Sequence, residues 1–412
     1  MIKVLGNQHL SSILAENSVK KVLDSKPGGL LAMESQLSLF SEPPESLKEF
    51  KLQHERFFVV GIGGSSLGIQ VLTDTFQIKN FDFIDNVDAA HFEKLLASVS
   101  DLEKIGWLFI SKSGATIETL AGLDFIIQFL QEKSVSLQKH CLVITEKKDS
   151  DLYNWTVAQK ILFFELPQSV GGRFSVLSAV GLVPAILMGL DIKKIQAGAL
   201  AAYHDERALV TLTEASLQSF KRQEWITVLW SYSSRLKSFG LWWQQLWAES
   251  LAKKIDHDLQ TASRVSTPLP LIGATDQHST LQQIMEGARD KMVFFLRAED
   301  AEKGSVVLKK SNFKETEVLR GQSLGTLLKA EAEAIQMALT EVGVSNLSVQ
   351  VSNIDEKTLG QLIMFFQLLV MSLGEALNIN TFNQPGVELG KIMAKNILKQ
   401  NANAHITATG AL

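Results

Sequence analysis

The stretch FFVVGIGGSSLG, residues 57–68, decides the fold that the sequence predicts. Its four leading apolar residues are typical of a strand buried on both faces, and the glycines that follow suit a tight turn that opens a helix. Similar apolar runs recur at residues 107–110, 141–145 and 161–166, separated by segments of helix length. This alternation predicts the α/β class, with a parallel sheet wrapped by helices.

The second half of the chain predicts a similar domain. Residues 195–254 have a helical pattern with five tryptophans along it, and tryptophans at such spacing favour a core or an interface. Apolar runs at residues 269–273, 292–296 and 347–352 then predict further strands. For 412 residues we therefore expect a first α/β domain over residues 1–190, a second over residues 191–375, and a helical C-terminal tail over residues 376–412.

The composition argues against a polyanionic partner. Forty Lys and Arg against 44 Asp and Glu leave a formal charge of −4, and no block of like charge suits a nucleic acid or a membrane surface. The single Cys141 lies in an apolar run, which predicts a buried thiol in a reducing compartment. The first residues lack the apolar core of a signal peptide, so we expect a cytoplasmic protein. Residues 176–190 are too short to span a membrane and predict a buried helix.

Two loops follow predicted strands and carry polar groups. In residues 61–68 the third glycine of a dinucleotide-binding motif is replaced by Ser66 and no Walker lysine follows Gly68, which leaves a glycine loop where Gly64 and Ser65 line a polar ligand. In SKSGATIET, residues 111–119, three hydroxyls lie where a helix begins: Ser111, Ser113 and Thr116. A plain helix cap needs one hydroxyl, so three favour a phosphate monoester, whereas Glu118 in the first turn is equally explained as a cap.

A lone arginine marks a second polar region. In VGGRFSVLSAVGL, residues 170–182, Arg173 stands between two glycines and an apolar run, and its guanidinium fork suits an anionic ligand. The alternative is an arginine that caps a buried helix and pairs with a carboxylate.

The later motifs each have two interpretations. Gln245 and Glu249 lie four apart on a helix among tryptophans, where a carboxylate with a raised pKa suits a general base; the alternative is an exposed ion pair with Lys253. His278 lies in a polar turn after a strand, where ligand sites gather. Gln384 precedes a Pro-Gly turn and Lys391 follows it, although a lone lysine there is usually solvated.

Taken in order, these stretches resemble the motifs of the phosphoglucose isomerases, whose Gly-Gly-Arg-Phe/Tyr-Ser signature is complete from Gly171 to Gly181. The resemblance covers nearly the whole chain and is closest to the shorter microbial forms. It implies two flavodoxin-like sugar-isomerase (SIS) domains, a homodimer, and no metal or other cofactor. The implied activity is the reversible isomerisation of glucose 6-phosphate and fructose 6-phosphate through a cis-enediolate, in glycolysis and gluconeogenesis.

The resemblance also implies residue roles. Glu249 would be the base that moves a proton between carbons 1 and 2, and Arg173 would stabilise the enediolate. His278, reaching the pocket from the partner subunit and oriented by Glu118, would open the sugar ring with Lys391. The remaining implied substrate contacts are to the phosphate, from Ser111, Ser113 and Thr116 with Lys112, Gly64 and Ser65 nearby, and to the sugar, from Gln245 and Gln384.

The sequence departs from the family pattern at three places, which bear on substrate breadth: Ser113-Gly114-Ala115 in the phosphate loop, Ala252 after the base, and Pro385 beside Gln384. Two alternatives therefore stay open. One is a dual phosphoglucose/phosphomannose isomerase, and the other is a phosphosugar-binding regulator without catalysis, which would have no need for Glu249, Arg173, His278 and Lys391 together.

Overall fold

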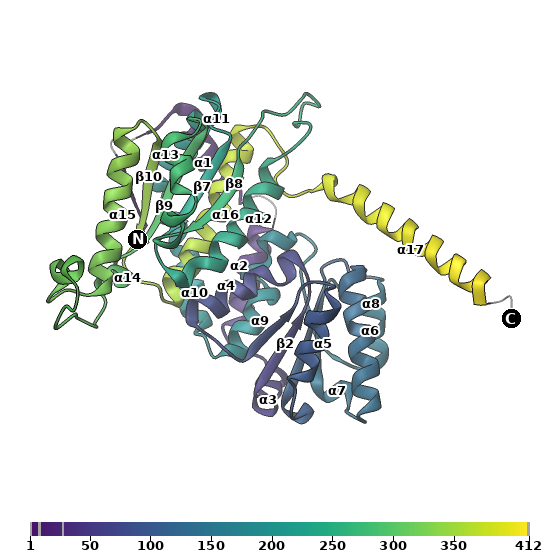
Figure 1. The fold of residues 1–412 in the computed structure, drawn as a ribbon. Coiled ribbons are helices and arrows are strands. Elements are labelled where there is room, and N and C mark those ends of the chain that lie inside the picture. The colour runs from purple at the N-terminus through teal and green to yellow at the C-terminus, as the bar shows by residue number, and fades with distance from the viewer. Residues whose placement is uncertain (1, 7–9, 27–28, 410–412) are drawn as a thin grey trace.

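The computed structural model describes residues 2–6, 10–26 and 29–409, with two five-stranded sheets at opposite ends of the molecule (Figure 1). All strands of the first sheet run parallel, in the order β3 (Phe81–Ile84), β2 (Arg56–Val60), β4 (Ile105–Ile110), β5 (Cys141–Thr145) and β6 (Leu162–Glu165). The four expected strands are confirmed, and β3 is an addition. When the five strands of this sheet are numbered along the chain, their order in space is 2-1-3-4-5, which is the order of flavodoxin-like sheets.

The second sheet has the order β1 (Lys3–Leu5), β10 (Ser345–Val351), β9 (Lys291–Ala298), β7 (Ile226–Ser231) and β8 (Thr267–Ile272). All but β1 are parallel. The helical assignment of residues 195–254 is wrong at β7, which lies inside this sheet between β8 and β9. A strand buried on both faces shows no alternation, so its continuous apolar run looks like part of a buried helix.

The N-terminal segment joins the second half of the molecule. Strand β1 pairs antiparallel with β10, and α1 (Ile13–Ser25) packs on α11 (Glu206–Lys221) and α16 (Glu356–Ala376). This differs from the expectation that residues 1–190 form the first domain alone. Because β1 covers the open edge of β10, the backbone groups of that edge are hydrogen-bonded.

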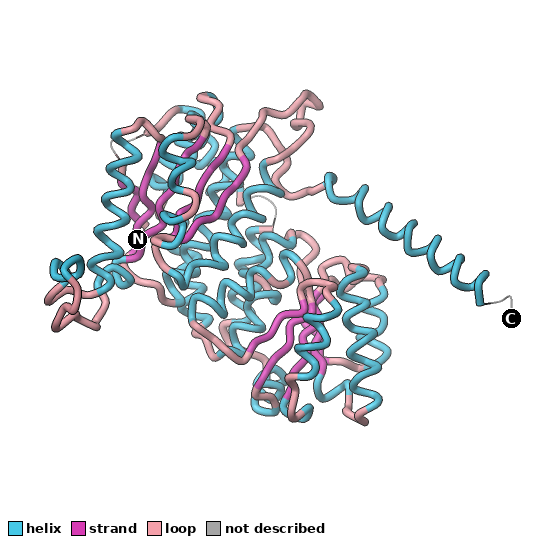
Figure 2. Tube along the Cα trace, viewed as in Figure 1, coloured by secondary structure: helices cyan, strands magenta, loops and turns pink. Residues whose placement is uncertain are grey.

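A layer of helices separates the two sheets (Figures 1 and 2). Within it α10 (Ile192–Ala201) packs on α16, and α12 (Lys237–Leu251) packs on α4 (Leu67–Phe76) and on α16. The other helices of this layer are α2 (Leu30–Phe40) and α9 (Ala179–Met188). The helices elsewhere are α3 (Glu45–Gln53), α5 (Ala89–Ala97), α6 (Ile117–Glu132), α7 (Leu137–His140), α8 (Asp151–Gln159), α13 (Leu281–Glu286), α14 (Glu299–Lys303) and α15 (Leu324–Glu341).

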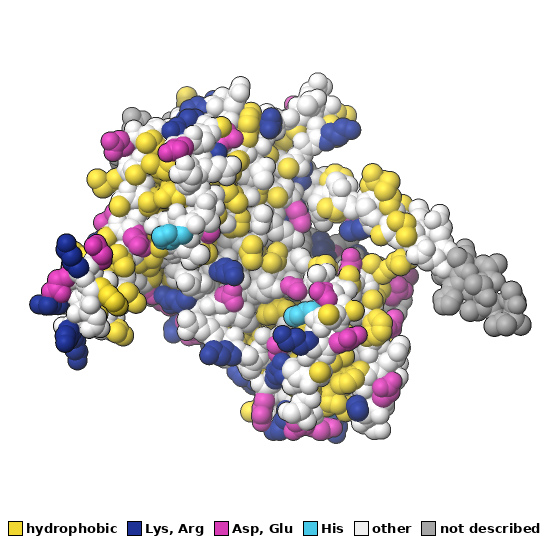
Figure 3. Space-filling model, in the orientation of Figure 1, with side chains coloured by type: hydrophobic (Ala, Val, Ile, Leu, Met, Phe, Trp, Pro, Cys, Tyr) yellow, Lys and Arg dark blue, Asp and Glu magenta, His cyan; other side chains and the backbone are white. Residues whose placement is uncertain are grey.

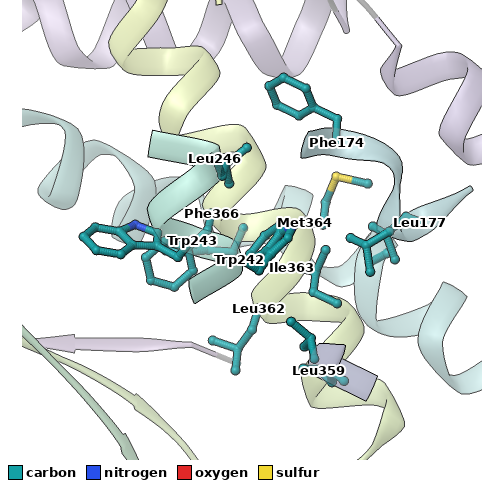
Figure 4. Close-up of a cluster of buried hydrophobic side chains, with 14 of the residues drawn as sticks. Phe174, Leu177, Trp242, Trp243, Leu246, Leu359, Leu362, Ile363, Met364 and Phe366 are labelled. Carbon is teal, nitrogen blue, oxygen red and sulfur yellow. The ribbon is translucent and has the colours of Figure 1, made fainter. Parts of the chain in front are cut away.

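The core of this layer explains the position of α12. Its buried residues recur at positions 239, 242, 243, 246, 247 and 250, which form one stripe of a helix. Trp242, Trp243 and Leu246 there belong to one buried cluster with Phe366 of α16 and Phe174 of the turn Gly172–Leu177 (Figure 4). The prediction that these tryptophans are core residues is confirmed. Gln245 and Glu249 lie outside the stripe and are therefore left partly exposed.

Two further predictions concern burial. Cys141 is buried in β5, and burial raises the pKa of its thiol to about 12, as expected for an unreactive cysteine. Residues 179–188 form the expected buried helix α9. Among the residues that the structure describes, one helix, α16, is long and apolar enough to cross a membrane, but 89% of its most apolar stretch is buried inside the protein, so α16 is a core helix.

The C-terminal tail is helical, as expected. Helix α17 (Glu388–Thr409) projects away from the rest of the chain (Figure 1). Its side chains from Glu388 to residue 401 are all exposed.

Candidate active site

The two loops predicted to bind the substrate lie side by side at the carboxyl ends of β2 and β4. These neighbouring strands are the point at which the strand order of the first sheet reverses, since β2 leads outward to β3 while β4 leads the other way to β5. Loops at such a point diverge and leave a crevice for ligands. A Cβ atom on Gly61 would lie 2.8 Å from the carbonyl oxygen of Ile110, so the glycine loop (residues 61–66) packs directly against the end of β4.

The serine loop (residues 111–116) gathers its three hydroxyls at the start of α6. Ser111 Oγ donates to Thr116 Oγ1 at 2.9 Å, and the hydroxyls of Ser113 and Thr116 lie 3.4 Å apart. Thr116 occupies the N-cap position without its side chain bonding to the helix amides. The first amides of this 16-residue helix therefore have no side-chain cap from Thr116, and that arrangement suits a dianionic phosphate.

The glycine loop also contacts the segment that carries Arg173. A Cβ atom on Gly64 would lie 2.3 Å from the carbonyl oxygen of Gly172, whereas one on Gly172 would meet open space. Ser175 Oγ donates to the Gly172 carbonyl at 2.6 Å and lies 3.2 Å from that of Gly64. The close approach that the glycines permit is thus made at Gly64.

Arg173 is buried and directs its guanidinium at a carboxylate. Nη1 donates to Glu249 Oε2 at 3.1 Å and to Gln384 Oε1 at 3.0 Å, and Nε donates to Ser250 Oγ at 2.8 Å. Burial lowers the pKa of Arg173, and the charge of Glu249 opposes that shift. The alternative of an arginine paired with a carboxylate is thus found, and the carboxylate is the expected base.

Glu249 faces this polar group and not the tryptophans. Its Oε1 accepts a hydrogen bond from Gln245 Nε2 at 3.0 Å, and its side chain is 28% exposed. The alternative ion pair with Lys253 is not formed, because Lys253 Nζ donates to the backbone carbonyl of Glu249 at 2.6 Å. We call Arg173, Gln245, Glu249, Ser250 and Gln384 the arginine cluster.

The arginine cluster touches the glycine loop. A Cβ atom on Gly63 would lie 3.1 Å from Gln245 Nε2, and Trp242 Nε1 donates to the backbone carbonyl of Arg173 at 3.2 Å. A series of contacts therefore runs from the end of β4, where the serine loop begins, through the glycine loop to Glu249. This series links the predicted phosphate site to the predicted base.

In the described chain three predicted residues lie outside this series, and Lys112 of the serine loop faces a buried carboxylate. Lys112 lies 3.6 Å from the buried carboxylate of Glu146. Glu118 lines a mostly apolar cavity of about 460 Å³ between α5 and α6, which the arginine cluster does not line. His278 follows β8 of the second sheet and is exposed. Lys391 lies on α17, where it pairs with Glu388 at 2.9 Å.

The sequence analysis missed Ser250 and the segment of residues 381–383. Ser250 occupies a position of the apolar stripe of α12, and a small polar residue there is a signal that could have been used. Thr381 and Asn383 contribute backbone carbonyls, both of which accept from Arg173 Nη2. Backbone contacts of this kind leave no pattern of side chains in a sequence.

Comparisons with known proteins identify the family of the chain. The model of the family described as phosphoglucose isomerase matches residues 51–410. The glucose-6-phosphate isomerase of Campylobacter jejuni is 34% identical over 400 residues, which cover 95% of this chain and 96% of that protein.

Two solved structures share the fold. A hypothetical protein from Thermus thermophilus has a TM-score of 0.82 at 30% identity, over 93% of this chain and 94% of that one. A glucose-6-phosphate isomerase from Chlamydia trachomatis has a TM-score of 0.74 at 23% identity, over 98% of this chain and 81% of that one. By the match of the family model and the identity to the Campylobacter enzyme, this chain belongs to the phosphoglucose isomerase family of aldose-ketose isomerases.

Proposed function

We propose that this chain interconverts glucose 6-phosphate and fructose 6-phosphate by proton transfer through Glu249. The observation that carries this proposal is the contact between Glu249 and the buried Arg173. The isomerisation needs a base beside a fixed positive charge, because the proton leaves a carbon next to a carbonyl and the oxygen becomes an anion. The arginine cluster supplies both groups, joined to each other by a hydrogen bond from Arg173 to Glu249.

In the proposed mechanism Glu249 removes the proton from carbon 2 of the open-chain aldose and returns it to carbon 1, while the hydroxyl proton of oxygen 2 moves to oxygen 1. The electron pair of the broken C–H bond forms the enediolate, whose oxygen charge is stabilised by Arg173. Gln245 holds the carboxylate of Glu249 from the side of the glycine loop. Gln384, which accepts from the same Arg173 Nη1 as Glu249, would contact the sugar.

The phosphate would bind at the serine loop. Ser111, Ser113 and Thr116 offer three hydroxyls beside the first turn of α6, and Gly64 and Ser65 lie on the neighbouring loop. A phosphate there favours the positive end of the helix dipole. The contacts of the glycine loop with both regions would set the distance between the phosphate and the reacting carbons.

Ring opening would require a second copy of the chain. His278 is exposed at the end of the second sheet, and we propose that it completes the pocket of the partner subunit beside Glu118 and Lys391. Support for a homodimer comes from α17, whose exposed side chains in Figure 3 include large apolar ones, more than half of each exposed: Leu389, Ile392, Met393, Ile397 and Leu398. An apolar helix without a partner is unfavourable in water, so a second copy would cover it.

The cellular setting follows from the proposed reaction. We propose a cytoplasmic enzyme of glycolysis and gluconeogenesis. The chain would act on a small phosphosugar, with no nucleic acid or membrane as partner.

The test combines an assay with one substitution. Wild-type protein should convert fructose 6-phosphate to glucose 6-phosphate in a coupled assay. Glu249→Gln keeps the shape of the side chain but removes the base, so turnover should fall about 100- to 10,000-fold while calorimetry still detects phosphosugar binding. Glu286→Gln, an exposed carboxylate on α13, is the matched control and should keep wild-type turnover.

Deuterium exchange separates the alternatives. Glu249→Gln should no longer carry solvent deuterium into carbon 2 of glucose 6-phosphate, and exchange at the wild-type rate would show that Glu249 is not the base. Binding without any exchange by the wild-type protein would favour the non-catalytic regulator. Equal turnover of mannose 6-phosphate would favour the dual isomerase.

A further inference from the structure

Lys253 joins the helix of the proposed base to a distant segment. Helix α12 ends at Leu251, so the carbonyls of its last turn need partners from outside the helix. Lys253 Nζ donates to one of them, that of Glu249, at 2.6 Å. It also donates to the backbone carbonyl of Asn383, which lies 130 residues further along the chain. A plain helix cap would need only the first contact.

The segment that Lys253 holds leads directly to two proposed substrate contacts. Residues 381–384 end at Gln384, and α17 with Lys391 begins four residues later. Arg173 Nη2 also donates to the Asn383 carbonyl, at 3.2 Å. This carbonyl therefore receives hydrogen bonds from two cations, each of which also donates to Glu249.

The charges around Lys253 limit its own ionisation. Partial burial and the charge of Arg173 lower the pKa of Lys253 to about 8, and the carboxylate of Glu249 opposes the shift. Arg173 and Glu249 are the charged groups that face it. Because the folded pKa lies below the ordinary value, the charged ammonium disfavours folding below pH 8, and that cost disappears as the pH rises through 8 toward 10.5. A contribution to the stability of the fold therefore does not explain a charged lysine at position 253.

We propose that Lys253 is a positioning residue that fixes residues 381–384 against the carboxyl end of α12, so that Gln384 stays in contact with Arg173. It rests on the proposed function, since its consequence is for catalysis. Lys253 touches no reacting atom in this scheme. Its hydrogen bonds to the backbone carbonyls of Glu249 and Asn383 set the distance between Glu249 and Gln384.

The test compares three variants. Lys253→Met keeps the length of the side chain but removes both hydrogen bonds, and since charged hydrogen bonds are the strong ones, turnover should fall about 10-fold or more with little change in KM. Lys253→Arg keeps the charge and the hydrogen-bond donors, so it should retain most of the turnover that Lys253→Met loses. Lys254→Met, at the exposed neighbouring lysine, is the control and should behave as wild type.

Hydrogen exchange gives a readout that does not depend on activity. The amides of residues 380–391 should exchange faster in Lys253→Met than in wild-type protein, with the melting temperature unchanged or raised. Unchanged exchange and turnover in Lys253→Met would overturn the positioning role, as would a fall in turnover that only follows a loss of stability. An inactive wild type would overturn the proposed function, and faster exchange in Lys253→Met would then still support the positioning role.

Discussion

Substituting Arg173 by lysine tests the fork geometry of the arginine cluster. The Arg173 guanidinium donates to acceptors on two segments: Ser250 Oγ, Glu249 Oε2, Gln384 Oε1 and the carbonyls of Thr381 and Asn383. A lysine ammonium has three protons, so at least two of these acceptors lose their donor. At about 1.5 kcal/mol for each lost hydrogen bond to a charged group, we expect the free energy of unfolding to fall by about 3 kcal/mol. The variant should therefore still fold.

The effect on catalysis should be larger than the effect on stability. A point charge at this position would not reproduce the directed donors that meet an oxyanion formed only in the transition state, and losing such a donor typically costs about 100-fold or more in kcat. KM should change little, because in the proposed site the serine loop, and not Arg173, holds the phosphate. Urea unfolding measures the free energy of unfolding, and steady-state assays with fructose 6-phosphate measure kcat and KM.

A matched substitution separates the site from the fold. Arg56 also uses its fork, donating to Asp82 Oδ2 and to the hydroxyl of Ser98, but it lies at the start of β2, at the opposite end of that strand from the glycine loop. Arg56→Lys should lower stability without changing kcat. If Arg173→Lys instead kept normal turnover with a raised KM, Arg173 would be a phosphate anchor and the reasoning would be wrong.

Three further predictions follow from the site and the fold. Activity should survive exhaustive chelation, because the proposed proton transfer through Glu249 needs no Lewis acid; loss with EDTA that one divalent ion restores would contradict this. Mixing inactive His278→Ala with inactive Glu249→Gln should restore part of the activity once subunits exchange, and verified heterodimers without activity would refute the shared pocket. Burial lowers the pKa of His54, whose Nε2 lies 3.0 Å from His140 Nδ1. Unfolding in urea should therefore become easier as the pH falls below about 6.5, and a pH dependence in His54→Gln as steep as in wild type would exclude His54 as the cause.

Local patterns in the sequence determined four of the five strands of the first sheet. The run of residues 57–60, followed by glycines, identified β2 and its loop because strand and turn propensities act within a few residues. The three hydroxyls of the serine loop were likewise recognisable, since they lie within six residues of one another at a helix start. The stripe of α12 placed Gln245 and Glu249 on one face for the same reason.

Tertiary structure decided what these elements meet. The apolar run of residues 226–231 is compatible with either a helix or a strand. Only its pairing with both β8 and β9 makes it strand β7. The first residues of the chain could not be assigned to the second sheet, because the pairing of β1 with β10 joins segments more than 340 residues apart.

The partner of Glu249 is the clearest case. Spacing favoured Lys253, four residues away, but α12 packs against the turn of Arg173, so the guanidinium reaches the carboxylate and Lys253 turns to the backbone. The sequence by itself thus determined which chemical groups are present and on which local element each lies, because propensity and periodicity are local. Only the packing of the helix layer between the sheets decided which of those groups touch, because contacts between distant segments depend on the whole core.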